Sequence, residues 1–179
     1  NSPYSEADET SPINAYGRTK LAGEQSIQSS GCDYLILRTS WVFSARGSNF
    51  LLSILRLASE RAQLSIVDDQ VGAPTWAGNI AEITKNIILL SEKQRHTGEF
   101  VSDVYNVVSS GMTTWFGFTN KIIEIASDMA LDGDFIVDQI KPIPSSEYPT
   151  PAKRPPYSVL STEKIEKAFG LPPIAWEHA

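Results

Sequence analysis

The chain reads Ser11-Pro-Ile-Asn-Ala-Tyr16-Gly-Arg-Thr-Lys20-Leu21 near its start, and this stretch decides how the rest is interpreted. Tyr16 and Lys20 are four residues apart, about one helical turn, so both side chains leave the same helix face. An ammonium group beside a phenol favours the phenolate, and such a phenol can exchange a proton with a carbonyl oxygen. Taken alone, the pair is better explained by two half-exposed side chains on an amphipathic helix.

A helix is predicted around this stretch. Ser11 suits the N-cap and Pro12 the first helical position, and the helix is expected to run to about Ser29 before Gly31 ends it. A glycine inside a helix costs about 1 kcal/mol relative to alanine, so Gly17 and the pair Ala22–Gly23 indicate close approach of a neighbouring backbone or ligand. The predicted inward face consists of Ile13, Tyr16, Gly17, Lys20, Leu21 and Ile27.

The apolar run Tyr34–Arg38 follows this helix and predicts a strand buried on both faces, as in a parallel sheet. A helix followed by such a strand is half of a βαβ unit and favours the α/β class. The alternation continues along the chain. Strands are predicted over 64–67, 105–108 and 135–140, and a loop over 68–75. Helices are predicted over 49–61, capped by Ser48 or Asn49, over 77–90, capped by Thr75, and to about 129, capped by Thr113 or Thr114. A last helix is capped by Ser161 or Thr162 and ends at Phe169 before Gly170.

Three stretches between these elements are candidates for ligand contact. Trp41 comes directly after the strand over 34–38, where open α/β sheets bind ligands, and it could offer a flat face to a sugar or base or be a core tryptophan. Asp68 and Asp69 could form a metal site or act as a general base, but on a turn such residues more often face solvent or cap a helix. The proline-rich segment 141–157 is either a linker or an ordered loop wrapping a site.

Composition excludes several classes of protein. The chain of 179 residues has a net charge of −6 with scattered Lys and Arg, which argues against a nucleic-acid partner. Cys32 is the only cysteine, and His96 and His178 lack metal-ligand spacing, so neither an internal disulfide nor a zinc site is expected. No apolar run approaches the roughly 20 residues of a membrane span. A cytoplasmic protein is expected.

Several segments, in order and over nearly the whole chain, resemble one enzyme family. The segment from Tyr16 to Glu24 is similar to the catalytic segment of extended short-chain dehydrogenases/reductases. The more specific segments Leu37-Arg-Thr-Ser-Trp41-Val-Phe and Pro149-Thr-Pro-Ala-Lys-Arg154-Pro resemble the dTDP-4-dehydrorhamnose reductases within that group. The resemblance implies the C-terminal part of a Rossmann-like parallel-sheet domain, interleaved with a smaller α/β substrate-binding domain. We assign residues 1–62 to the former and 63–179 to the latter.

The resemblance also implies a reaction and a set of residue roles. The C4 ketone of dTDP-4-dehydro-L-rhamnose would be reduced by NADPH or NADH to give dTDP-L-rhamnose, a precursor of cell-surface polysaccharide such as O-antigen. Tyr16 would protonate the C4 oxygen, and Lys20 would favour the phenolate and hold the nicotinamide ribose. Trp41 would contact the dTDP-sugar, and Arg154 would lie near the same site. A full-length protein could also form a homodimer.

Two features of the family pattern are missing from this sequence. No Gly-x-x-Gly-x-x-Gly turn for the cofactor pyrophosphate occurs, and the Ser or Thr of the catalytic set would precede Asn1. We therefore expect a C-terminal fragment that is inactive by itself. Some family members bind magnesium through glutamates, but the matching position here is Gly78, so no metal is expected. The alternatives are a nucleotide-sugar epimerase of the same group and a non-catalytic regulatory relative.

Overall fold

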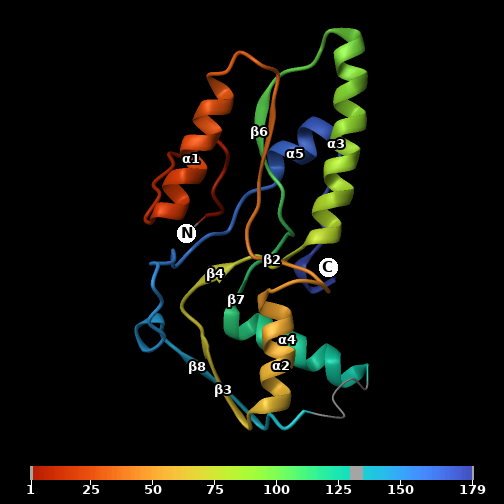
Figure 1. Ribbon diagram of the computed structural model, residues 1–179. Helices are drawn as coiled ribbons and strands as arrows, with labels where there is room; N and C mark the ends of the chain where they lie inside the picture. Colours follow the sequence, from red (N-terminus) through yellow and green to blue (C-terminus); the bar gives the residue numbers. More distant parts are fainter. Residues whose placement is uncertain (1, 130–134, 179) are drawn as a thin grey trace.

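The computed structural model describes residues 2–129 and 135–178, and its elements form an upper and a lower group in the view of Figure 1. The upper group comprises α1 (Ala15–Gln28), α3 (Ala77–Thr97), α5 (Glu163–Phe169), β1 (Leu35–Arg38) and β6 (Asp103–Asn106). The lower group comprises α2 (Phe50–Glu60), α4 (Trp115–Asp128), β3 (Gln63–Val67) and β8 (Gln139–Ile143). The short strands are β2 (Val42–Phe43), β4 (Val71–Gly72), β5 (Thr75–Trp76) and β7 (Thr113–Thr114), and the 3₁₀ turns are Ser145–Glu147 and Trp176–His178.

Parallel pairing dominates the strands. β1 pairs with β6, β2 with β5 and β3 with β8, all in parallel, whereas β4 and β7 are antiparallel. The predicted α/β class with parallel strands is therefore confirmed. The proposed boundary between residues 62 and 63 stays a prediction, although the pairing of β1 with β6 joins strands from both sides of it.

Two hydrophobic cores hold the groups together. In the lower core, aromatic side chains from α2, α4 and β2 meet aliphatic ones from β3. In the upper core, α3 and α5 pack against β6. The buried residues of the lower core are Phe43, Ile54, Leu64, Ile66, Phe118, Ile122 and Trp176, and those of the upper core are Ile83, Ile87, Tyr105, Val107 and Ile165.

The helix that carries Tyr16 differs from the prediction in two ways. Its N-cap is Asn14, whose side chain accepts a hydrogen bond from the Gly17 N–H, so the predicted cap at Ser11 with Pro12 inside the helix is wrong. The predicted inward face is not buried, because α1 buries no residue and Tyr16 is 71% exposed. This face borders an open cleft instead of a packed layer. Gly17 does lie close to Pro12, as a small residue allows, but nothing approaches Gly23.

Three further boundaries or environments differ from the prediction. Only Ile36 of β1 is buried, so this strand is half-covered and not buried on both faces. Helix α3 continues to Thr97 because Gly98, in the left-handed conformation, is the first residue to end it. Thr75 is not its cap; the buried Thr75 hydroxyl bridges the Ala73 carbonyl and the Ser109 N–H.

The strand predicted over 135–140 begins later, at Gln139, and continues to Ile143. Residues 130–134 of the preceding connection lie outside the described residues. The register with β3 pairs Gln63 with Gln139 and places Pro142 inside the strand. A proline is accommodated there because a two-stranded sheet leaves each strand one open edge.

Other predictions agree with the structure. Asn49 and Thr114 cap α2 and α4 through side-chain hydrogen bonds, and Gly170 closes α5 in the left-handed conformation. The proline-rich segment is an ordered loop and not a linker, because the Pro156 carbonyl and the Ser158 N–H both bond to Val71. None of the described helices is long and apolar enough to cross a membrane.

Candidate functional site

Tyr16 and Lys20 lie together on the first turns of α1. The Lys20 ammonium is 5.4 Å from the centre of the Tyr16 ring. The start of the helix is held by Asn14, whose amide also donates to the Lys153 carbonyl at 2.9 Å. Within the described residues, Lys20 forms no ion pair, so its ammonium is available to a ligand that enters from the side of Tyr16.

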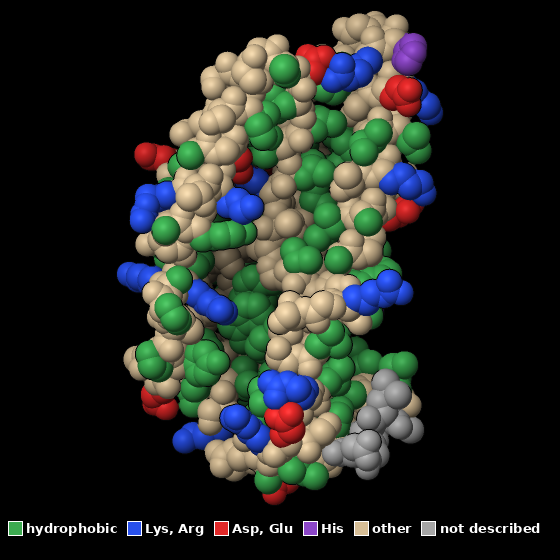
Figure 2. Space-filling model, in the orientation of Figure 1, with side chains coloured by type: hydrophobic (Ala, Val, Ile, Leu, Met, Phe, Trp, Pro, Cys, Tyr) green, Lys and Arg blue, Asp and Glu red, His purple; other side chains and the backbone are tan. Residues whose placement is uncertain are grey.

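These two residues border a cleft of about 630 Å³ between α1, the N-terminal segment, the end of β1 and the segment after the proline-rich loop. Figure 2 shows this face as hollowed near its middle, with hydrophobic side chains at the bottom of the hollow. The cleft therefore combines an apolar floor with many polar and charged groups around it, among them Asp8 and Glu9 of the N-terminal segment. Its lining includes Tyr4, Tyr16, Gly17, Lys20, Leu21, Glu24, Leu37, Arg38, Thr39, Ser40, Asn106, Pro155, Tyr157, Ser158 and Leu160.

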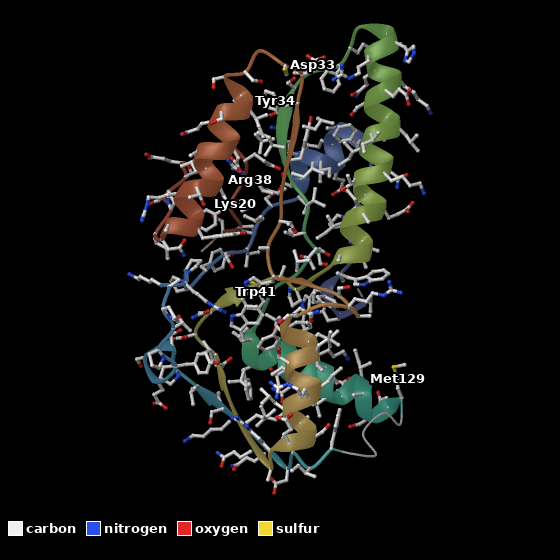
Figure 3. All side chains as sticks on the ribbon, in the orientation of Figure 1. Lys20, Asp33, Tyr34, Arg38, Trp41 and Met129 are labelled. Carbon is white, nitrogen blue, oxygen red and sulfur yellow. The ribbon has the colours of Figure 1, made fainter. Side chains whose placement is uncertain are left out.

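An ion pair crosses the cleft and attaches α1 to β1. The Arg38 guanidinium donates to both oxygens of Glu24, with its shortest contact at 2.6 Å from Nη2. Both side chains are about one-fifth exposed, at 23% and 19%. The Glu24 hydrogen bonds raise the pKa of Arg38 above its ordinary value, and the pair stays charged. Figure 3 shows Arg38 and Lys20 between the two elements.

A buried asparagine at the end of β6 organises the opposite wall. The Asn106 amide donates to the carbonyls of Tyr4 and Ser161, and its backbone N–H donates to the Glu6 carboxylate at 2.7 Å. Tyr4 in turn exchanges backbone hydrogen bonds with Val159 and Ser161. The N-terminal segment is thereby fixed against the sheet and forms a defined side of the cleft.

Trp41 is next to the cleft residue Ser40 but does not itself line the cleft. It has a φ of 50°, in the left-handed region that non-glycine residues rarely adopt. Its ring stacks on Trp115 with centroids 3.5 Å apart and planes 2° apart. Trp41 is therefore half-buried and packs against another aromatic ring, as a core tryptophan would, while it lies beside a residue of the cleft.

Arg154 is exposed and forms neither a hydrogen bond nor an ion pair with another described residue. It precedes Pro155, which does line the cleft, but Arg154 itself does not. The structure thus brings Tyr16 and Lys20 together and leaves Trp41 and Arg154 at the margin. The roles assigned to all four residues stay predictions.

Asp68 and Asp69 hold loops together. Asp68 accepts a hydrogen bond from the hydroxyl of Thr114, and Asp69 accepts from the hydroxyl and backbone N–H of Ser145. The Ser145 hydroxyl and then its N–H lower the pKa of Asp69 below its ordinary value. Across residues 2–129 and 135–178, no three His, Cys, Asp or Glu side chains gather as a metal site would require.

The cleft fits one end of a nicotinamide cofactor. An ammonium group and a phenol on one helix face can hydrogen-bond to ribose hydroxyls, and the apolar floor can accept a flat ring. A pyrophosphate needs a glycine-rich turn at a helix N-terminus, and the sequence has no such motif. The residues present therefore fit the nicotinamide half of the cofactor only.

Sequence reasoning missed the residues that fix the cleft. The sequence pattern includes Glu24 and Arg38 only as the last residues of the segment from Tyr16 and of the predicted strand over 34–38, and it gives no role to Glu6. The pairing of Glu24 with Arg38 spans 14 positions, and that of Glu6 with Asn106 spans 100. The one available signal was the single charged residue, Arg38, at the end of the otherwise apolar strand β1.

Comparison with known proteins gives a consistent family match. A model of the family described as "RmlD substrate binding domain" matches residues 1–179. A dTDP-4-dehydrorhamnose reductase from Burkholderia thailandensis is 48% identical over 99% of this chain and 60% of its own length. The enzyme of the same name from Escherichia coli K12 is 39% identical over 98% of this chain and 56% of its own length. The chain thus spans less than two thirds of these relatives.

Solved structures agree with the sequence matches. A dTDP-4-dehydrorhamnose reductase from Clostridium acetobutylicum superposes with a TM-score of 0.85 at 29% identity, over 99% of this chain and 57% of that one. A Bacillus anthracis protein of the same name, solved in complex with NADP, gives a TM-score of 0.78 at 32% identity, over 98% and 57% of the two chains.

Proposed function

Because the chain belongs to the family of the RmlD substrate binding domain, we propose that it is the larger part of a reductase that converts dTDP-4-dehydro-L-rhamnose into dTDP-L-rhamnose. The observation that carries the proposal is the Tyr16–Lys20 pair beside a cleft, in a chain 48% identical to a reductase of that name. The Bacillus anthracis relative is described with NADP, which supports NADPH or NADH as the reductant here.

Each residue has a stated part in this proposal. NADPH or NADH, when bound, would supply the hydride for C4 of the sugar. The Tyr16 phenol donates its proton to the C4 oxygen as the carbonyl becomes an alcohol. The Lys20 ammonium would orient the cofactor ribose. Its positive charge would also favour the phenolate that Tyr16 becomes after it has donated its proton. Glu24 and Arg38 keep α1 at a fixed distance from the sheet, so that the phenol stays in place.

The proposal also includes further substrate contacts, the location of the protein and its assembly. Trp41 and Arg154 would contact the nucleotide sugar from the margin of the cleft. The protein would be cytoplasmic, would supply a deoxysugar for cell-surface polysaccharide, and would form a homodimer when the remaining part is present. An epimerase is the weaker alternative, because the relatives above share the reductase name over nearly the whole chain.

The test uses the chain joined to the remaining two-fifths of the Burkholderia thailandensis relative, hereafter the completed enzyme. We expect steady oxidation of NADPH when dTDP-4-dehydrorhamnose is present, with dTDP-rhamnose as product. The chain alone should give no steady oxidation, because the pyrophosphate site is absent from its sequence. A completed enzyme that folds and interconverts dTDP-sugar epimers without consuming NADPH would overturn the proposal.

A further inference from the structure

One side chain joins the N-terminus of α1 to the proline-rich segment. Asn14 Oδ1 accepts a hydrogen bond from the Gly17 N–H at 2.8 Å, and Asn14 Nδ2 donates to the Lys153 carbonyl at 2.9 Å. A serine or an aspartate would cap the helix as well as asparagine does. Only an amide, however, carries an acceptor and a donor on two separate atoms. The donor half of this amide is therefore used for the contact with Lys153 and not for the cap.

This contact lies in a loop that is otherwise held only at its ends. We call residues 146–155 the strap, and all of them are exposed. Before the strap, the hydroxyl and N–H of Ser145 donate to Asp69, and after it the Pro156 carbonyl accepts from the Val71 N–H at 2.8 Å. Among the described residues, the bond from the cap of α1 is the one hydrogen bond that joins the strap to anything but the residues directly before it.

The strap carries two cationic side chains at the margin of the cleft. Lys153 and Arg154 are adjacent, and neither forms an ion pair with another described residue. The next residue, Pro155, lines the cleft that holds Tyr16. The strap rises from the end of β8 toward the N-terminal end of α1 (Figure 1). The bond at Lys153 therefore sets where these side chains lie relative to the helix that carries Tyr16.

We propose that Asn14 is a positioning residue, which keeps the strap in one place relative to the Tyr16 helix when a nucleotide sugar binds. The proposal rests on the proposed function, because that function supplies the ligand. Asn14 does not itself line the cleft, and it acts through its two backbone partners. A residue that only capped the helix would have no effect on the strap.

The same arrangement at α2 provides a matched control. Asn49 Oδ1 accepts from the Leu52 N–H at 3.2 Å, and Asn49 Nδ2 donates to the carbonyls of Ser44 and Arg46 at 2.8 and 3.2 Å. This amide holds the loop before α2, which does not line the cleft. Serine at either position keeps an oxygen for the cap, but its side chain is too short to replace the amide donor. Asn49→Ser therefore repeats the change of Asn14→Ser at a site away from the cleft.

The first test measures the rate of trypsin cleavage of the completed enzyme by mass spectrometry. Trypsin cuts after Lys and Arg but poorly before Pro, so cleavage in this part of the strap occurs after Lys153. Asn14→Ser should speed this cleavage about fivefold, because one hydrogen bond no longer opposes the opening of the strap. Cleavage between Arg46 and Gly47 should not change. Asn49→Ser should have the opposite pattern, with faster cleavage after Arg46 alone.

The second test measures kcat and KM of the completed enzyme. Asn14→Ser should raise the KM for dTDP-4-dehydrorhamnose about fivefold, whereas the KM for NADPH should stay the same and kcat should change less than about twofold. Asn14→Asp should give the same split, because its carboxylate caps the helix but offers only acceptor oxygens to the Lys153 carbonyl. Asn49→Ser should change none of these constants. The Tm shows whether each variant is folded, and if Asn14→Ser does not fold, Asn14→Asp decides.

Three outcomes would overturn these ideas in distinguishable ways. Unchanged cleavage after Lys153 in both Asn14 variants would show that Asn14 does not hold the strap. Faster cleavage with an unchanged KM for the sugar would remove the positioning role. A folded wild-type completed enzyme without reductase activity would instead overturn the proposed function, and the cleavage rates would still decide whether Asn14 holds the strap.

Discussion

Individual carboxylates connect loops in this protein, as the hydrogen bonds of Asp69 illustrate. Its oxygens accept hydrogen bonds from the hydroxyl and the N–H of Ser145, 76 positions away. These bonds connect the loop after β3 to the turn after β8. The sequence predicted Asp68 and Asp69 as turn residues that face solvent. It could not predict their hydroxyl partners, Thr114 and Ser145, because Ser and Thr are common and nothing in the local sequence indicates which carboxylate each will contact.

The lowered pKa of Asp69 gives a testable pH dependence. Its folded value lies below the ordinary 3.8, so the carboxylate stabilises the fold fully above the unfolded pKa. That contribution is lost as the pH falls through the lower folded pKa. We expect urea unfolding at about pH 6 and about pH 3 to show a smaller loss of stability for Asp69→Asn than for the wild type.

Asp138→Asn is the control for that series, since the Asp138 side chain is exposed and forms no hydrogen bond or ion pair with another described residue. An Asp69→Asn protein that loses as much stability on acidification as the wild type would show that the Ser145 hydrogen bonds do not lower the pKa of Asp69 in the folded protein.

At the scale of elements, α1 depends on a few specific contacts. The helix buries no residue, so its position is set by the Glu24–Arg38 ion pair and by the hydrogen bond from Asn14 to the Lys153 carbonyl. Its polar and small residues could be recognised from the sequence. Its exposure could not, because the same periodicity describes a helix packed on a core and one that borders a cleft.

Breaking the ion pair should release this helix. Glu24→Gln removes the charge but keeps the shape, and it leaves the half-buried Arg38 guanidinium without its partner, which we expect to cost about 1–3 kcal/mol. Hydrogen exchange should then speed up in α1 and not in α3. Glu60→Gln removes an exposed i,i+4 pair with Arg56 and should change little. Unchanged exchange in α1 would contradict this role.

The other elements were predicted correctly where the local sequence contains the signals for their ends. Helices α2 and α4 carry their N-caps in the local sequence and α5 carries its terminating Gly170, and the bounds of all three were close to the prediction. Strand β8 was displaced because its limits are set by pairing with β3, and pairing over long sequence distances leaves no local signal. Helix α3 was predicted too short because no breaker precedes Gly98.

At the scale of the molecule, the residues assigned to the proposed reaction lie in or beside one cleft. Tyr16 and Lys20 line a cleft whose walls are fixed by Glu24, Arg38 and Asn106. The motif spacing predicted the first two residues, and the family resemblance suggested the substrate. The walls depend on contacts between distant segments and became visible only in the folded chain.

The measurement that tests the central claim most directly is the turnover of the completed enzyme with Tyr16→Phe. This change removes one hydroxyl and keeps the ring over which Lys20 lies. If the phenol protonates the C4 oxygen, kcat for dTDP-4-dehydrorhamnose should fall at least about a hundredfold, with little change in the KM for NADPH. A Tyr16→Phe enzyme that reduces the sugar at nearly the wild-type rate would contradict the account.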